Sequence, residues 1–514
     1  MRRSTSSALA CVIGALSASL AFLPRADAEL PSGSEPPLLV SSVNLKALSD
    51  AITEMDIAAA TALIKRYSSV ALSVVDAQRL ALERARLALY VADCDSADAI
   101  LSPLPPDDPQ RASMADLALR CSRATAAGLV VEDKPRGVWL RIQDARDEGL
   151  APYIAEVASR ARDAIEYDLG VVLPRPLRID LVRDLFSLSA VSGLPVEAAE
   201  TTGTVAVARW GRVTLLSPQA ARHGYPWEDT LAHEIVHLAL SRGTRDHAPL
   251  WLQEGVAKRG ELRWRDSRPF DDPDNHDRVA KVALESGNSV GVDNLGPSIA
   301  MLPSADAAAI AFSEVTSFIS YWINQNGRPA LHLLLADLKG GDDRDPDPAL
   351  RSVSGYSLKE WIVRWQAYLR QLQLGDIEGE RFFADADARE LSRSSRLGDL
   401  LFQGQHFEAA AQYFADAHAL APRLPAFRVR LSQAQLAERD PAAARETLGS
   451  MDDLAAPTGA WLALHARFVL EDWSSEARDA SAPGAKDPGP QAQRDLTWAL
   501  GMDPWSEVVA CEGY

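Results

Sequence analysis

The first part of the chain carries apolar residues at helical spacing. Between about 39 and 128 the sequence is rich in alanine and leucine, and it is broken near 68–69 and at the proline-rich stretch 103–107. Segments this short favour short helices, and the turn residues between them let successive helices fold back on one another. We therefore expect helices paired into antiparallel hairpins over residues 29–130.

The middle of the chain changes period. Residues 138–142 and 177–182 alternate between apolar and polar, which is typical of strands, and 205–216 contains two more such stretches that predict a β-hairpin. A helical pattern occupies 151–169, and the spacing is helical again over 266–372. The fold class that we expect is α+β, with a small mixed sheet beside a helical subdomain.

The last part of the chain repeats with a period of about 34 residues, the length of a tetratricopeptide repeat. Its large, small and terminating residues are Leu397, Gly398, Phe407, Ala410, Phe414, Ala417 and Pro422, followed one period later by Leu431, Ser432, Ala444 and Leu448. We expect tetratricopeptide-like repeats over 385–480 and a linker and tail over 481–514; residues 94–100 match the repeat more weakly. A protein partner on the concave face of these repeats is one interpretation, and a packing appendage is the other.

The most informative pattern is the run from His233 to His237, with the sequence HEIVH. On a helix, two histidines four positions apart lie one turn above the other, so both imidazoles can reach one zinc ion. Glu254 follows His237 by 17 positions, far enough for a second helix to present its carboxylate as a third ligand. Glu234 adjoins a ligand and is too near to be another, so its natural role is to take a proton from the zinc-bound water. These are the residues needed to hydrolyse an amide.

The surroundings of this motif argue against a coincidence. Its neighbours on the helix are uncharged: Thr230, Leu231, Ala232, Ile235, Val236, Leu238, Ala239 and Leu240. In such an apolar helix Glu234 would be a costly buried charge, and a zinc site explains it. Pro226 suits the first turn of the helix and Gly243 its end. A purely structural role for the motif is the alternative.

The motif and two neighbouring segments resemble a known family. With APLWLQEGVA at 248–257 and VAVARWGRVTLLSP at 205–218, HEIVH looks like the peptidase MA-like domain of the gluzincin metallopeptidases. The resemblance extends over about 134–372, and its later part is carried by GPSIAMLP at 296–303, FSEVTSFISYW at 312–322 and GYSLKEW at 355–361. It implies a zincin-like catalytic domain in which His233, His237 and Glu254 bind zinc and Glu234 is the general base.

Two positions depart from the family's pattern. Thermolysin-like members carry an aspartate four residues after the ligand glutamate, where it orients a ligand histidine, but this chain has Lys258. Phe312 stands where the resemblance implies a tyrosine. The group that orients the histidine and the donor that stabilises the oxyanion are thus left unassigned. His223, Tyr225 and His247 are candidates for that donor, although a lone histidine is more often a surface residue.

The resemblance also implies where a substrate would lie. In zincins the strand just before the metal-binding helix forms the sheet edge and pairs with an extended substrate. We expect this strand at Val213–Leu216, where its main chain would bind a peptide by strand addition. The alternative is an ordinary hairpin covered by its own loops.

The first residues predict export. A basic start, Met1–Arg3, precedes the apolar stretch Ala8–Leu23 and the small residues of a cleavage site at 26–28. We expect a signal peptide over 1–28 and a secreted or periplasmic protein that begins at Glu29. A membrane anchor is the alternative, but the apolar stretch is shorter than the ~20 residues needed to span a bilayer, so we expect no membrane span after cleavage.

Charge and cysteine content narrow the range of partners. The formal net charge of −18 excludes binding of nucleic acid through a general electrostatic attraction. In an oxidising compartment Cys94 and Cys121 could bridge two neighbouring helices, while buried free thiols are the alternative. Cys511 would remain without a partner in the mature chain.

These features predict a zinc-dependent peptidase that acts on peptides or proteins. Endopeptidase and aminopeptidase both stay open, although the sequence lacks the G-x-M-E-N motif with which aminopeptidases hold a free amine, which favours the former. The rival class is a non-catalytic repeat scaffold or protein-binding module with a structural zinc site.

The signal-peptide prediction can be checked directly. N-terminal sequencing of the exported protein should begin at Glu29 or within a few residues of it, because signal peptidase cuts after a small residue such as Ala28. Recovery of soluble cytoplasmic protein that still starts at Met1 would contradict the prediction.

Overall fold

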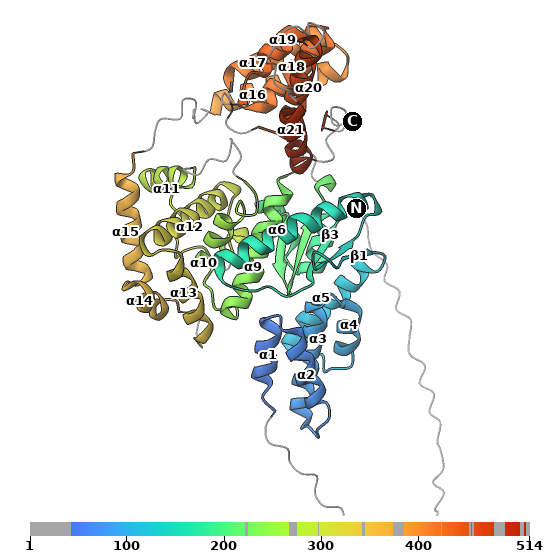
Figure 1. The fold of residues 1–514 in the computed structure, drawn as a ribbon, viewed down its shortest axis with the longest axis vertical. Helices are drawn as coiled ribbons and strands as arrows, with labels where there is room; N and C mark the ends of the chain where they lie inside the picture. The colour runs from blue at the N-terminus through green and yellow to red at the C-terminus, as the bar shows by residue number, and fades with distance from the viewer. Residues whose placement is uncertain are drawn as a thin grey trace, which may run out of the picture. The chain divides into compact units, whose positions relative to one another are not determined.

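The fold is known from a computed structural model. It describes residues 43–220, 225–266, 275–296, 298–341, 345–373, 385–422, 424–451, 454, 457–476, 489–503 and 508–509 (Figure 1). The predicted signal peptide, 1–28, lies outside the described residues. Among the described residues, no helix combines the length and apolar character that crossing a bilayer requires.

Five helices occupy the stretch for which helical hairpins are expected. They are α1 (Leu45–Thr53), α2 (Ile57–Tyr67), α3 (Val74–Tyr90), α4 (Cys94–Leu101) and α5 (Pro109–Thr125). Each begins after a side chain that accepts a hydrogen bond from the first turn: Asn44, Asp56, Ser73, Asp93 and Asp108. Such caps satisfy N–H groups that a helix leaves free, which explains why short helices start where they do. Cys94 and Cys121 form a disulfide between α4 and α5, which decides between the two alternatives that the sequence left open.

A five-stranded mixed sheet follows. Its strands are β1 (Leu129–Asp133), β2 (Val138–Ile142), β3 (Leu177–Val182), β4 (Ala206–Arg209) and β5 (Arg212–Leu216), in the order β1-β2-β3-β5-β4. The two outer pairs are antiparallel, and β2, β3 and β5 run parallel. The α+β class is therefore confirmed, while β1 was not predicted.

The position of β5 corrects one prediction. The expected edge strand, Val213–Leu216, pairs with β3 on one side and β4 on the other, and every residue of β5 is buried. The edge is β4 instead. The two-residue turn of Trp210 and Gly211, both with positive φ, folds β4 back along β5 and leaves it outermost.

Helices cover both faces of the sheet. Alternate residues of β2, β3 and β5 pack with α6 (Ala151–Leu169) and α9 (Trp227–Thr244), which cross the sheet in Figure 1. On the opposite face, Val182 and Leu216 join a cluster with α3, α4, α5 and α7 (Leu185–Ser192). The remaining elements here are η1 (Ala145–Leu150), α8 (Val196–Thr202), η2 (Pro218–Ala220) and α10 (Leu250–Gly260).

A helical subdomain follows α10. It consists of α11 (Asn275–Ser286), η3 (Ile299–Met301), α12 (Ala305–Asn326), α13 (Arg328–Gly340), α14 (Asp347–Ser354) and α15 (Leu358–Gln371). Its core is aromatic, with Phe318 packed edge-on between Trp251 of α10 and Trp365 of α15. This packing joins the subdomain to the helix that carries Glu254.

The described residues of the C-terminal part form six helices: α16 (Asp385–Gln403), α17 (Phe407–Leu420), α18 (Pro425–Ala437), α19 (Pro441–Leu448), α20 (Gly459–Glu476) and α21 (Gly489–Met502). A Cβ at Gly398 would collide with the Phe414 ring, so α16 and α17 approach as closely as the repeat pattern requires. α21 lies within the segment 481–514, for which only a linker and tail were predicted.

A buried polar network joins the sheet to the N-terminal helices. Asp180 of β3 lies 2.6 Å from Arg141 of β2 and 3.1 Å from Arg212 of β5, and the last is fully buried. Burial lowers the pKa of Arg212 to about 10, although Asp180 opposes this shift. Arg212 also donates to the carbonyl of Leu89 at 2.7 Å, and Arg141 to that of Ala92 at 3.0 Å, both at the end of α3.

Breaking this network should destabilise the protein strongly. Arg212→Met should lower the free energy of unfolding by about 3–5 kcal/mol, because it removes one cation from a buried carboxylate. Urea denaturation would measure the change. The control is Arg183→Met, which removes an exposed arginine at the end of β3 and should cost within ~0.5 kcal/mol. Equal stability of the two variants would contradict the role given to Arg212.

Candidate metal centre

Two helices bring the predicted ligands together. His233 and His237 lie one turn apart on α9, and Glu254 lies in the middle of α10. The Nε2 atoms of the two histidines are 3.2 Å apart, and Glu254 Oε2 lies 3.6 Å from that of His233 and 3.5 Å from that of His237. All three sequence-predicted ligands therefore converge on one point.

The donor set fits a zinc ion. Two imidazole nitrogens and a carboxylate oxygen, all within 4.8 Å of one another, are the ligand types of catalytic zinc sites with three protein ligands. Gly255, next to Glu254, allows the close packing behind it, because a Cβ there would lie 2.6 Å from the Val315 carbonyl of α12. α10 can thus lie directly on α12 and hold the third donor in place.

The charges around His233 also favour a cation. Burial alone would lower the pKa of His233, but hydrogen bonds with Glu254 and Glu261 outweigh this effect and raise it to about 10. Burial would raise the pKa of Glu254, yet the two histidines hold it well below its ordinary value. Two carboxylates therefore stabilise positive charge here, as they would for a divalent cation.

Glu261 orients His233, and sequence reasoning missed it. Its Oε2 lies 3.3 Å from His233 Nδ1, and its Oε1 lies 2.7 Å from the ammonium group of Lys258. A carboxylate behind a ligand histidine fixes the ring and its tautomer. Lys258 thus does not replace the expected aspartate but positions Glu261. The signal was present in the spacing, since Glu261 follows Glu254 by seven residues, or two helical turns.

Glu234 is buried beside the ligands. Its side chain has 8% of its surface exposed, and its charge acts on both His233 and Tyr225. Asp229, an acid one turn earlier on α9, is bound by Trp264 and Arg265 at 2.9 Å. No hydrogen bond of this kind engages Glu234 within the part of the chain that the structure describes. Its carboxylate is therefore available for proton transfer.

The structure describes two of the three candidates for the oxyanion donor, Tyr225 and His247. The Tyr225 hydroxyl donates to the Leu216 carbonyl, and its burial, with the charges of Asp147 and Glu234, raises the pKa of Tyr225 well above its ordinary value. His247 makes a 2.9 Å hydrogen bond to the Leu338 carbonyl in α13, so the structure does not bring it to the ligands. His223 lies outside the described residues.

Phe312 also lies at the site. Its ring meets that of His233 edge to face, with centroids 6.3 Å apart. A phenylalanine offers no hydroxyl at this position, so it supports the histidine by packing alone. The described residues therefore leave the oxyanion donor unassigned.

The sheet edge lies beside the metal-binding helix. β4 packs on α9, and Arg209 and Arg212 flank the hairpin turn as a hydrogen-bonded pair. Alternation from this pair turns the main-chain groups of Val207 towards β5 and those of Ala206 and Ala208 outwards. The 2.8 Å bond from Leu216 N–H to the Val205 carbonyl continues the same alternation. An extended peptide could therefore pair with Ala206 and Ala208.

Known proteins add nothing to this geometry. A comparison with models of protein families finds no match, and comparisons with curated proteins and with solved structures find none either. The resemblance to the gluzincins thus stands on the motifs in the chain and remains a prediction.

The role of Glu261 can be tested through zinc affinity. Glu261→Gln should weaken zinc binding about 10–100-fold, because the charge behind His233 is lost while the size of the side chain is kept. Competition with a chromophoric chelator measures this change. Glu285→Gln, which removes an exposed glutamate on α11, is the matched control and should bind zinc like the wild type. An unchanged affinity of Glu261→Gln would refute the orienting role.

Proposed function

We propose that this chain is a zinc-dependent peptidase of gluzincin type, with His233, His237 and Glu254 as metal ligands and Glu234 as general base. The observation that carries the proposal is the convergence of the three donor atoms next to a buried carboxylate that no described residue engages. Glu261, which holds the far side of His233, adds the second sphere that functional zinc sites have.

The chemistry divides between the metal and the chain. A bound zinc ion supplies a Lewis acid and lowers the pKa of water to near neutral. Glu234 would take a proton from the attacking water and return it to the nitrogen of the departing amine. Burial of Glu234 keeps this exchange away from bulk solvent. The chain thus contributes a fixed set of metal ligands and one carboxylate that accepts and returns a proton.

The substrate class follows from the sheet edge. The outward main-chain groups of Ala206 and Ala208 suit a peptide in extended conformation, which would join the sheet at the outer edge of β4. An edge of this kind recognises the backbone rather than a particular side chain. It therefore supports peptides or proteins as substrates.

The compartment is part of the same proposal. The Cys94–Cys121 disulfide is of the kind that persists in oxidising surroundings, and it supports a secreted or periplasmic location. The signal sequence proposed for 1–28 agrees with this location. A protein partner at the C-terminal repeats stays a proposal as well, supported by the paired helices α16 to α19.

The rival function is a scaffold with a structural zinc site. Structural sites are closed by four protein ligands, whereas only three donors cluster here among the described residues. A structural site also has no use for Glu234, whose burial would then cost free energy without return. Both observations favour the enzyme.

Two glutamine variants separate the roles of the glutamates. Glu234→Gln should keep one zinc per chain and lose about 10²–10⁴ in kcat/KM, because only the proton acceptor is removed. Glu254→Gln should lose zinc and activity together, because a neutral amide replaces a charged ligand. Metal analysis and cleavage of a fluorescence-quenched peptide library measure the two properties. A wild-type chain that binds zinc but cleaves no peptide in the library would favour the scaffold.

A further inference from the structure

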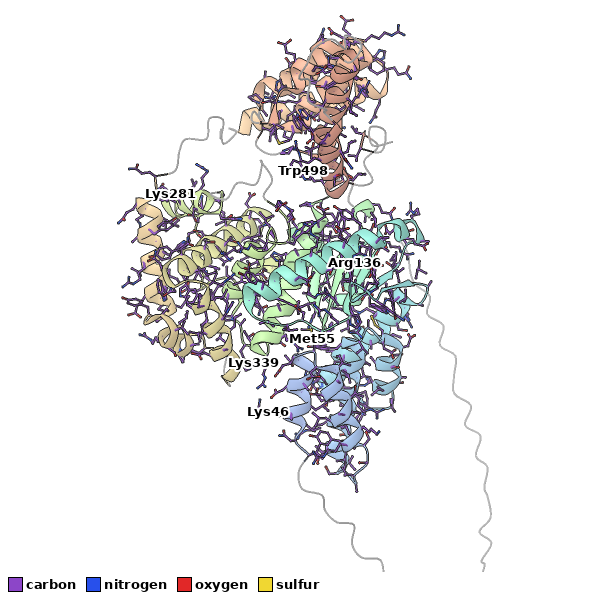
Figure 2. The ribbon with its side chains drawn as sticks, in the orientation of Figure 1. Lys46, Met55, Arg136, Lys281, Lys339 and Trp498 are labelled. Carbon is purple, nitrogen blue, oxygen red and sulfur yellow. A yellow bond between two sulfur atoms is a disulfide. The ribbon has the colours of Figure 1, made fainter. Side chains whose placement is uncertain are left out.

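A cavity of about 340 Å³ adjoins the metal ligand His237. One side is formed by α3 and by Met55, just after α1, which is labelled in Figure 2; the other is formed by α9 and α10. The turn between β4 and β5 completes the lining. The volume lies at the lower end of the ~300–1,000 Å³ typical of ligand pockets, which suits one side chain or the end of a peptide.

The hairpin turn and α3 are fitted to each other. A Cβ at Gly211 would lie 2.6 Å from a ring carbon of Tyr90, and the positive φ of Gly211 already disfavours other residues. Tyr90 also meets Trp210 edge to face, with ring centroids 6.3 Å apart. This side of the cavity is therefore preformed by the N-terminal helices.

A turn of unusual conformation forms the opposite side. Arg245 and Asp246, directly after α9, have φ values of 55° and 61°, a region that costs a residue with a side chain roughly 1–2 kcal/mol. Arg245 is held by Glu54 of the α1–α2 turn at 2.5 Å, and Lys339 reaches the same carboxylate at 2.9 Å. Asp246 thereby faces the cavity, where Ser241 donates to it.

The first of two arginines in the lining has its charge compensated within the protein. Arg86 donates to Ser49 Oγ at 2.8 Å and to Thr53 Oγ1 at 2.5 Å, and Glu83 lies 3.4 Å away. Burial lowers the pKa of Arg86, but nearby groups that include Glu83 and Asp246 raise it overall. Arg86 is thus a fixed part of the lining.

The second arginine is different. Arg209, the last residue of β4, is exposed and lies over the Trp210 ring, 5.1 Å from its centroid. Its closest polar partner is the carbonyl of Ser192, at 3.5 Å. Among the described residues no carboxylate lies within ion-pair distance of Arg209. The cavity therefore offers an uncompensated guanidinium at the end of the strand along which a peptide would lie.

We propose that this cavity is a substrate subsite that binds a carboxylate of the peptide through Arg209, either an acidic side chain or the chain-terminal carboxylate. The inference rests on the proposed peptidase function and adds a selectivity to it. The N-terminal helices then belong to the recognition machinery, since they form the side of the cavity opposite the metal-binding helices.

Peptides that differ only in charge test the subsite. Fluorescence-quenched peptides with Glu, Gln or Lys at one position at a time should show, at one position, a kcat/KM at least about 10-fold higher for Glu than for Gln. A second set with free or amidated C-termini identifies the terminal carboxylate as the source if the preference follows the free end. Arg209→Gln should bring the ratio to about one, and Arg209→Glu should favour Lys. Arg183→Gln is the control and should keep the wild-type ratio.

Binding provides a readout without cleavage. Fluorescence anisotropy of the same peptides, unquenched, with the Glu234→Gln chain as purified should show the same Glu preference and lose it with Arg209→Gln. If Glu peptides bind more tightly than Gln peptides but the wild type cleaves neither, the subsite proposal is supported and the peptidase function is refuted. The subsite proposal would be overturned if the wild type cleaved Glu and Gln peptides at equal rates at every position and for both kinds of C-terminus, and if Arg209→Gln changed none of these rates. The proposed peptidase function would then still stand.

Discussion

The buried carboxylate of Asp180 is the point on which the arrangement around the site depends. A charge this far from water is tolerated only when it is paired and its partners are themselves satisfied. Asp180 is paired with Arg141 and Arg212. These arginines also donate to two main-chain carbonyls, that of Leu89 in the last turn of α3 and that of Ala92 just beyond the helix. The Leu89 carbonyl belongs to the negative end of α3, which favours a cation. The ion pairs of the sheet thus hold the end of α3 against the sheet, next to the turn between β4 and β5.

At the candidate metal centre, a buried charge is left without a partner. Most acids near it are engaged: Asp147 accepts from Ser217 and Gln219, and Asp229 is bound by Trp264 and Arg265. Burial raises the pKa of Asp147 despite its partners. Glu234 is buried as well, but no described residue donates to it. Unlike Asp147 and Asp229, Glu234 therefore has a carboxylate that is available for chemistry.

The sequence predicted that three side chains would converge because their relation is local. His233 and His237 are separated by one helical turn, and Glu254 lies on a second helix that the segment 248–257 predicted. Glu261 was missed because the family's pattern points to position 258, on the same helix as Glu254, whereas Glu261 directly follows the end of that helix. The edge strand was placed wrongly, at Val213–Leu216, because the order of strands in a sheet depends on partners distant in sequence. The cavity, formed by segments more than a hundred residues apart, had no signal in any single pattern.

The two sides of the cavity beside His237 come from different parts of the chain. The metal ligands lie on α9 and α10, whereas Tyr90 and Arg86 belong to a segment that ends before the sheet begins. Substitutions in that segment can reshape the space beside His237 without touching a zinc ligand or the proton acceptor. In the proposed peptidase, the reaction and part of the selectivity are therefore encoded in separate stretches of the chain, so that evolution can change one while it preserves the other.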